Sequence, residues 1–71
     1  MKTAEAARIT GLALIPGGHV LGSGVITWRL DQEFRGIAAD RLELAYMPSV
    51  REFKLWHGGH IIETWNVKKP D

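Results

Sequence analysis

The sequence predicts a small, mainly β domain: an antiparallel barrel or sandwich of about five strands, built from two hairpins, with one short helix. The strongest indication is a pair of β-rich runs that flank Gly58-Gly59, because two glycines accept the positive φ angles of a two-residue hairpin turn. A second pair of runs surrounds Pro16-Gly17-Gly18. No internal repeat or linker divides the 71 residues, so we expect a single domain over residues 1–71.

The first part of the chain combines a helical start with the first hairpin. Residues Thr3 to Arg8 contain a short alanine run and suit one or two helical turns, with Thr3 as the N-cap. Residues 8–15 and 19–30 then form a strand pair around Pro16-Gly17-Gly18, where proline presets the first corner of a tight turn. Within the return strand, Gly22-Ser23-Gly24 indicates a bulge or bend.

The segment over residues 31–47 permits two interpretations. Apolar residues near helical spacing, followed by Pro48, would give a central helix at 31–47 and an α+β fold. Gly36 would lie inside that helix and cost it about 1 kcal/mol relative to alanine. Residues Leu42 to Tyr46 also alternate as a strand does. We therefore expect a strand there and keep the central helix as the alternative.

The hairpin over residues 51–67 has a definite predicted register. With the turn at Gly58-Gly59, the facing pairs are His57–His60, Trp56–Ile61, Leu55–Ile62, Lys54–Glu63, Phe53–Thr64 and Glu52–Trp65. The Lys54–Glu63 match supports this register, because opposite charges across a strand pair stabilise it. One face then carries Phe53, Leu55, Ile62 and Thr64, and the other carries Trp56, Ile61, Trp65 and Val67.

Both faces of this hairpin are apolar, and a chain of 7.9 kDa has one small core to cover them. The second face therefore needs another part of the fold or another subunit. Tryptophan is enriched at the centres of protein interfaces, and the chain has three. The residues predicted to form a protein interface are Trp28, Trp56, Ile61, Trp65 and Val67. We expect a homo-oligomer or an as yet unidentified protein partner.

The sequence favours a non-catalytic binding protein that acts through protein contacts, as an accessory, inhibitor or assembly component. There is no cysteine, and Ser23 lacks the Gly-x-Ser-x-Gly setting of a nucleophile. A single domain of this size has little room for an enclosed active site, so an enzyme would need a site between subunits. We therefore assign no catalytic residue and no cofactor.

The main alternative is a small oligomeric regulator that binds single-stranded nucleic acid. Tryptophans could stack on bases, and the cations that could contact phosphates are Arg29, Arg35, Arg51, Lys54, Lys68 and Lys69. Acidic residues lie close to the arginines in the sequence, and the net charge is only +1. These two features make the nucleic-acid hypothesis the weaker one.

A metal site is a further, less favoured hypothesis. His57 and His60 would project together from the Gly-Gly turn, and His19 could supply a third ligand. Cellular location is predicted from two other features. The first eight residues lack the apolar centre of a signal peptide, and the absence of cysteine fits a reducing compartment, so we expect a cytoplasmic protein. No apolar run approaches the roughly 18 residues that cross a bilayer, which predicts no membrane contact.

Overall fold

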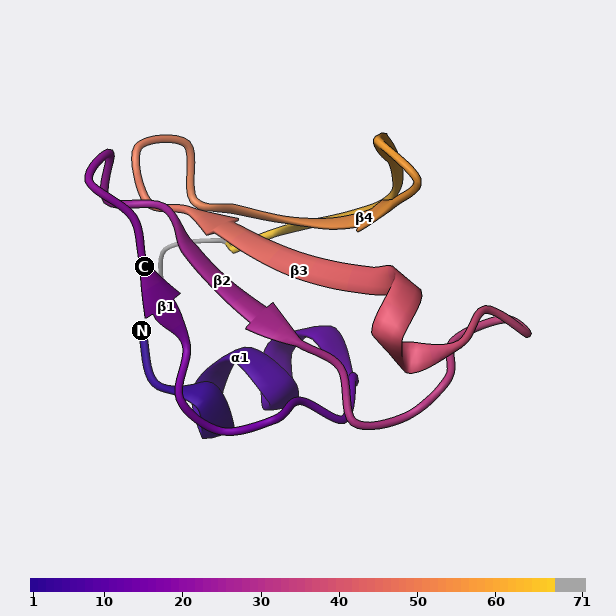
Figure 1. The fold of residues 1–71 in the computed structure, drawn as a ribbon. Helices are drawn as coiled ribbons and strands as arrows, with labels where there is room; N and C mark the ends of the chain where they lie inside the picture. The colour runs from indigo at the N-terminus through magenta and orange to yellow at the C-terminus, as the bar shows by residue number, and fades with distance from the viewer. Residues whose placement is uncertain (68–71) are drawn as a thin grey trace.

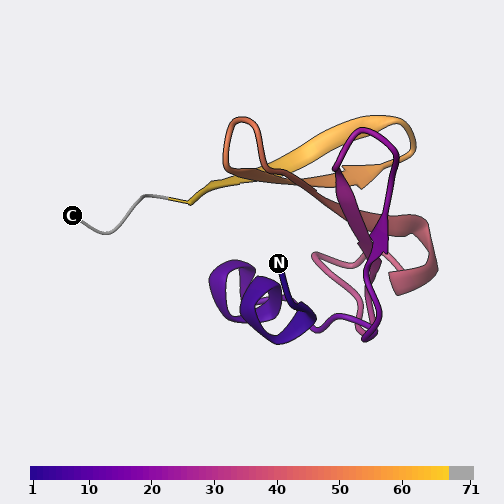
Figure 2. The same ribbon diagram turned by 90° about the vertical axis from the view of Figure 1, so that its left-hand side faces the viewer.

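The fold is a five-stranded antiparallel sheet with one short helix against one face (Figures 1 and 2). A computed structural model describes residues 1–67. In spatial and chain order the strands are β1 (His19–Val20), β2 (Ile26–Arg29), β3 (Leu42–Met47), β4 (Glu52–His57) and β5 (His60–Asn66). The mainly β prediction is confirmed. All five strands belong to one open sheet, however, so the expected barrel or sandwich is wrong in its closure.

Helix α1 spans Thr3–Thr10, two residues further than the sequence predicts. It ends at Gly11, whose left-handed φ of 74° directs its N–H back to the carbonyl of Ala7 at 2.8 Å. Thr3 is not the N-cap: Lys2 occupies that position without a side-chain cap. The hydroxyl of Thr3 instead accepts a hydrogen bond from the indole N–H of Trp28, at 3.0 Å. Tertiary contact with β2, rather than local capping, thus fixes the start of the helix.

The first hairpin turns later in the chain than predicted. β1 pairs with β2 through His19–Thr27 and Val20–Ile26, and the turn between them runs over residues 21–25. The carbonyl of Leu21 accepts a hydrogen bond from the N–H of Gly24, and the N–H of Leu21 donates to the carbonyl of Val25. The Gly-Ser-Gly segment is therefore the hairpin tip rather than a bulge. The predicted strand over residues 8–15 is mostly helix and loop. Among the described residues, its ladder contact is limited to the isolated bridge between Leu14 and Leu30.

The middle of the chain forms a strand, as expected, and the alternative central helix is wrong. A tight turn closes the bridge between Phe34 and Ile37, with Gly36 at a φ of 80° that excludes it from a right-handed helix. A single 3-10 turn, η1 (Ala39–Arg41), then leads directly into β3.

The β4–β5 hairpin has the predicted turn but a different register. Gly58 and Gly59 both adopt positive φ, and His57–His60 and Trp56–Ile61 pair as expected. A bulge follows, so the next pair is Leu55–Glu63 and Ile62 is the extra residue. The remaining pairs are Lys54–Thr64, Phe53–Trp65 and Glu52–Asn66. The predicted Lys54–Glu63 pairing is therefore wrong.

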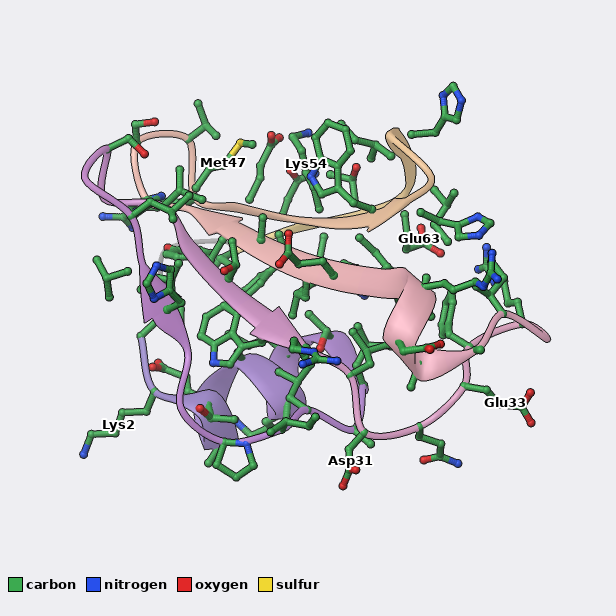
Figure 3. All side chains as sticks on the ribbon, viewed as in Figure 1. Lys2, Asp31, Glu33, Met47, Lys54 and Glu63 are labelled. Carbon is green, nitrogen blue, oxygen red and sulfur yellow. The ribbon has the colours of Figure 1, made fainter. Side chains whose placement is uncertain are left out.

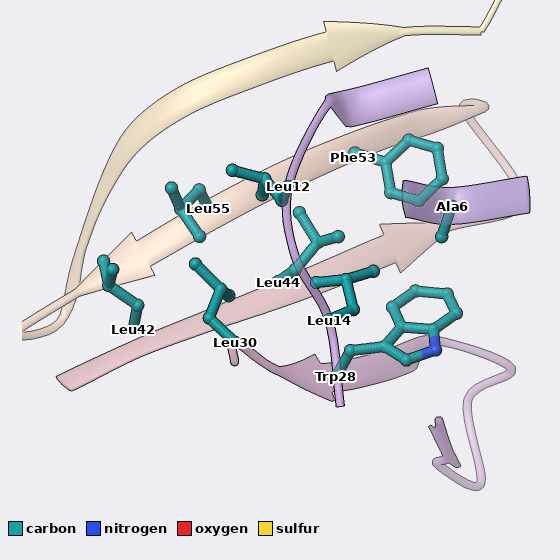
Figure 4. Close-up of a cluster of buried hydrophobic side chains, with 9 residues drawn as sticks. All are labelled: Ala6, Leu12, Leu14, Trp28, Leu30, Leu42, Leu44, Phe53 and Leu55. Atoms are coloured by element: carbon teal, nitrogen blue, oxygen red, sulfur yellow. The ribbon is translucent and has the colours of Figure 1, made fainter. Parts of the chain in front are cut away.

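The core lies between the sheet and a cover made of α1 and the segment after it (Figure 4). Its buried members are Ala6, Leu12, Leu14, Trp28, Leu30, Leu42, Leu44, Phe53 and Leu55. The ring of Phe53 packs 4.6 Å from that of Tyr46 and 6.2 Å from that of Trp28, measured between centroids. We call the face that carries this core the inner face, and the opposite one the outer face.

Among the described residues, no helix has the length and the hydrophobicity needed to cross a membrane.

Candidate protein-binding groove on the outer face

The outer face carries the residues that alternate with the core along each strand. One row across the sheet is Arg29, Glu43, Trp56 and Ile61, and the next is Thr27, Ala45, Lys54 and Thr64. Figure 3 shows Met47 and Lys54 on the side of the sheet away from α1. Because the described chain has one α-helix and it lies against the inner face, no helix covers these rows (Figure 2).

A groove of about 390 Å³ runs over this face from the β1–β2 hairpin to the β4–β5 turn. Its wall is mainly apolar, and the lining residues that matter here are Leu21, Val25, Glu43, Ala45, Met47 and Trp56. We call these six residues the outer groove. They come from strands β3 and β4 and from the tip of the β1–β2 hairpin, which the meander topology brings side by side.

Part of the apolar surface of the outer groove is exposed to water. Leu21 is 42% exposed, and Trp56 and Met47 are half-buried, whereas Ala45 at the floor is 4% exposed. Ile61, beside Trp56 in the same cross-strand row, is 44% exposed. Single exposed apolar residues are ordinary on a protein surface, but a continuous set that lines a groove is typical of a binding site.

Glu43 is the one acidic side chain of the outer groove, and it also borders two neighbouring hollows. One hollow, of about 380 Å³, includes Arg29 and Trp56; the other, of about 270 Å³, includes Arg29 and His19. Within residues 1–67, the ion pairs join other side chains, and none includes Glu43. Its carboxylate is exposed, so a cation brought by a partner can reach it beside the cross-strand residue Arg29.

The predicted interface residues divide between the two faces. Trp28 is 2% exposed and belongs to the core, so almost none of its surface is accessible to a partner. Trp65 and Val67 pack against the core from the inner face. Trp56 and Ile61 remain on the outer face, where sequence reasoning placed all four hairpin residues together. The bulge at Ile62 causes the division, because one extra residue moves everything after it to the other face.

Sequence reasoning missed most of the outer groove. Leu21, Val25, Glu43, Ala45 and Met47 were not among the candidates, yet they line it with Trp56. A signal for part of the set was present in β3, where Glu43, Ala45 and Met47 share the strand face opposite to the leucines. Nothing local in the sequence indicates that the β1–β2 hairpin tip completes the wall.

Within residues 1–67, the cations proposed for nucleic-acid binding do not gather on one surface. Arg29 and Lys54 lie on the outer face, Arg35 lies in the loop before η1, Arg51 lies in the β3–β4 turn, and Lys68 and Lys69 lie outside the described residues. Two of the cations are engaged: Arg35 contacts Glu63 at 2.6 Å, and Lys54 contacts Glu52 at 3.4 Å. The hollow beside Trp56 contains Arg29 and Arg41, but Asp40 and Glu43 share it.

The three histidines are not brought together. His57 and His60 face each other across the turn as predicted, whereas His19 lies on β1, at the opposite edge of the sheet. Residues 1–67 contain no group of three potential metal ligands.

Comparisons with protein-family models, with curated proteins and with solved structures give no match.

Proposed function

We propose that the protein is a non-catalytic binding module that acts through protein contacts and receives its partner in the outer groove. The observation that carries the proposal is a sheet face that no helix of residues 1–67 covers, with a mainly apolar groove beside a carboxylate that forms no ion pair within those residues. Small-molecule sites span about 300–1,000 Å³, so the groove has room for a few side chains of a partner.

The chemistry of the groove defines the partner. Leu21, Val25, Met47 and Trp56 offer apolar surface, which favours aliphatic or aromatic side chains. Methionine and tryptophan suit this role, because the first adapts its shape and the second supplies a large rigid contact. Glu43 adds a requirement for one Lys or Arg beside the apolar group. The expected ligand is a short protein segment with two or three apolar residues and one cationic residue.

A peptide-library selection on the purified protein tests this proposal. The selected peptides should share apolar residues and a Lys or Arg, and we expect Trp56→Ala to weaken their binding at least tenfold. The control is Val20→Ala, because Val20 is 64% exposed and apolar but does not line the outer groove. Circular dichroism and thermal unfolding of each variant establish that it is folded.

A charge exchange makes the role of Glu43 specific. Glu43→Lys should weaken binding of a selected peptide, and replacing the cation of that peptide by glutamate should restore it. Equal affinities of the Trp56→Ala, Val20→Ala and unaltered proteins would contradict the proposed site, as would selected peptides without any cationic residue.

A further inference from the structure

The two edges of the sheet differ greatly in length. β1 at one edge has two residues, whereas β5 at the other has seven, His60–Asn66. In the described part of the chain, β5 pairs with β4 alone. A long edge strand presents a row of backbone donors and acceptors that a further strand can satisfy.

One hydrogen bond and the register show which backbone N–H and C=O groups of β5 face β4 and which face the free edge. The N–H of Val67 donates to the carbonyl of Arg51 at 2.8 Å, next to the pairs Glu52–Asn66 and Phe53–Trp65. In an antiparallel ladder, successive residues direct their backbone groups alternately toward the partner strand and away from it. Trp65 and Glu63 therefore face β4 with their backbone groups, and Thr64 and Asn66 direct theirs to the free edge.

The composition of β5 does not protect this edge. Proteins usually block exposed edges with proline, lysine, a charge, a β-bulge or a very short strand. β5 contains neither proline nor lysine, and its residues include isoleucine, threonine and tryptophan, which favour strands. Its carboxylate, on Glu63, is held by Arg35 of the same chain. The bulge at Ile62 distorts the start of the strand and leaves residues 63–66 regular.

We propose that β5 pairs antiparallel with β5 of a second copy of this chain, through the outward backbone groups of Thr64 and Asn66. A contact between the β5 strands of two copies is favoured over a contact between β5 of one copy and β1 of another. β1 offers two residues only, and such a head-to-tail contact would not close as a dimer. The β5–β5 contact is two-fold symmetric and closes as a dimer. The outward backbone groups of Thr64 can pair with those of Thr64 or of Asn66 in the other copy. Each Glu63 then lies opposite Trp65 or Val67 of the other copy, respectively, so the two Glu63 carboxylates do not face each other.

This dimer would extend the proposed function without depending on it. A two-fold axis perpendicular to the joined sheet keeps both outer faces on the same side. The two outer grooves would then point the same way and bind a partner that carries two suitable segments with increased avidity. The dimer itself rests on the backbone of β5 and not on the groove.

The solution mass of the full chain, measured by light scattering from 10 μM to 1 mM, tests the proposal. We expect a dimer for the unaltered protein and for Thr64→Ala, which keeps the backbone amide. Thr64→Pro removes an outward N–H and leaves the ladder with β4 intact, since an edge strand accepts proline where its N–H faces solvent. It should raise the dissociation constant at least tenfold while circular dichroism stays unchanged.

Cysteine cross-linking gives a second measurement in case Thr64→Pro does not fold. The chain has no cysteine, so Thr64→Cys introduces a unique thiol. It should form an intermolecular disulfide much faster than Val20→Cys, which lies exposed at the opposite edge. Equal cross-linking rates, a monomer at 1 mM, or a dimer unaffected by Thr64→Pro would overturn the proposal.

Trp56→Ala separates this inference from the proposed function. It should weaken peptide binding at least tenfold and leave the dimer intact. Loss of the dimer in that variant would instead identify the outer groove as the contact between copies and overturn the β5 assignment.

Discussion

At the scale of single residues, Trp28 connects the helix to the sheet. Its indole N–H donates to the hydroxyl of Thr3, and the backbone N–H of Gly17 donates to the same oxygen at 3.3 Å. One hydroxyl on α1 thus satisfies a part-buried donor on β2 and a loop amide. An unsatisfied indole N–H at this position would cost about 1–3 kcal/mol, so these bonds favour one docking of the helix.

Gly18 is in close contact with the same indole, and this contact predicts an effect on stability. A Cβ at Gly18 would lie 2.5 Å from Nε1 and 2.8 Å from Cε2 of Trp28. The indole is buried beside Phe53 and cannot move without disturbing the core. Gly18→Ala should therefore lower the free energy of unfolding by about 1–3 kcal/mol, as overpacking of a core does. Urea denaturation followed by tryptophan fluorescence measures the change.

Gly22→Ala is the matched control, because a Cβ there has no atom within 4 Å and its backbone does not require positive φ. It should leave the free energy of unfolding within about 0.5 kcal/mol of the original value. Equal stability of the two alanine variants would contradict the close packing of Gly18 on Trp28.

At the scale of elements, the sequence predicts strands and turns better than their registers. Gly58-Gly59 indicates its turn because few other residues accept two positive φ angles, and the leucine alternation indicates β3. The bulge at Ile62 has no such signal: the extra residue is another strand former in a run of strand formers. The wrong register also misplaces two residues of the predicted interface, because the sheet face on which Trp65 and Val67 lie depends on the register.

The bulge makes a testable distinction between two tryptophans of one hairpin. Trp65 packs against the core on the inner face, whereas Trp56 lines the outer groove. Trp65→Ala should therefore reduce the free energy of unfolding by at least about 1.5 kcal/mol more than Trp56→Ala, since only the first removes contacts with the core. Urea titrations of both variants at one low protein concentration provide the comparison. Equal losses would favour the regular register, in which both side chains share a face.

At the scale of the whole molecule, α1 and the segment after it cover one sheet face, and no helix of residues 1–67 covers the other. The sequence predicts about five strands and more apolar surface than one core can bury. It did not predict the open sheet. Closure would need β1 to pair with β5, and β1 has two residues because Gly22-Ser23-Gly24 forms the turn instead of a bulge within a longer strand. The turn over residues 21–25 thus ends β1 at Val20, and the sheet is open.

The balance of forces over the whole chain predicts that stability depends little on salt. Within residues 1–67 the ion pairs are Arg35–Glu63 and Lys54–Glu52, and all four side chains are partly exposed to water. Exposed pairs of this kind contribute about 0–1 kcal/mol each, and a net charge of +1 leaves little long-range repulsion to screen. Raising NaCl from 50 mM to 1 M should therefore change the free energy of unfolding by less than about 1 kcal/mol.

Urea titrations at the two salt concentrations measure this dependence, because urea itself adds no ions. Arg35→Ala serves as the reference, since it lacks the shorter ion pair and should respond to salt in the same way as the unaltered chain. A loss of more than about 2 kcal/mol at high salt would show that charge interactions, rather than the nine-residue core and the strand ladder, are the main stabilising contribution to the fold. A small response in both proteins would instead locate the stabilising free energy in buried apolar contacts, which salt does not screen.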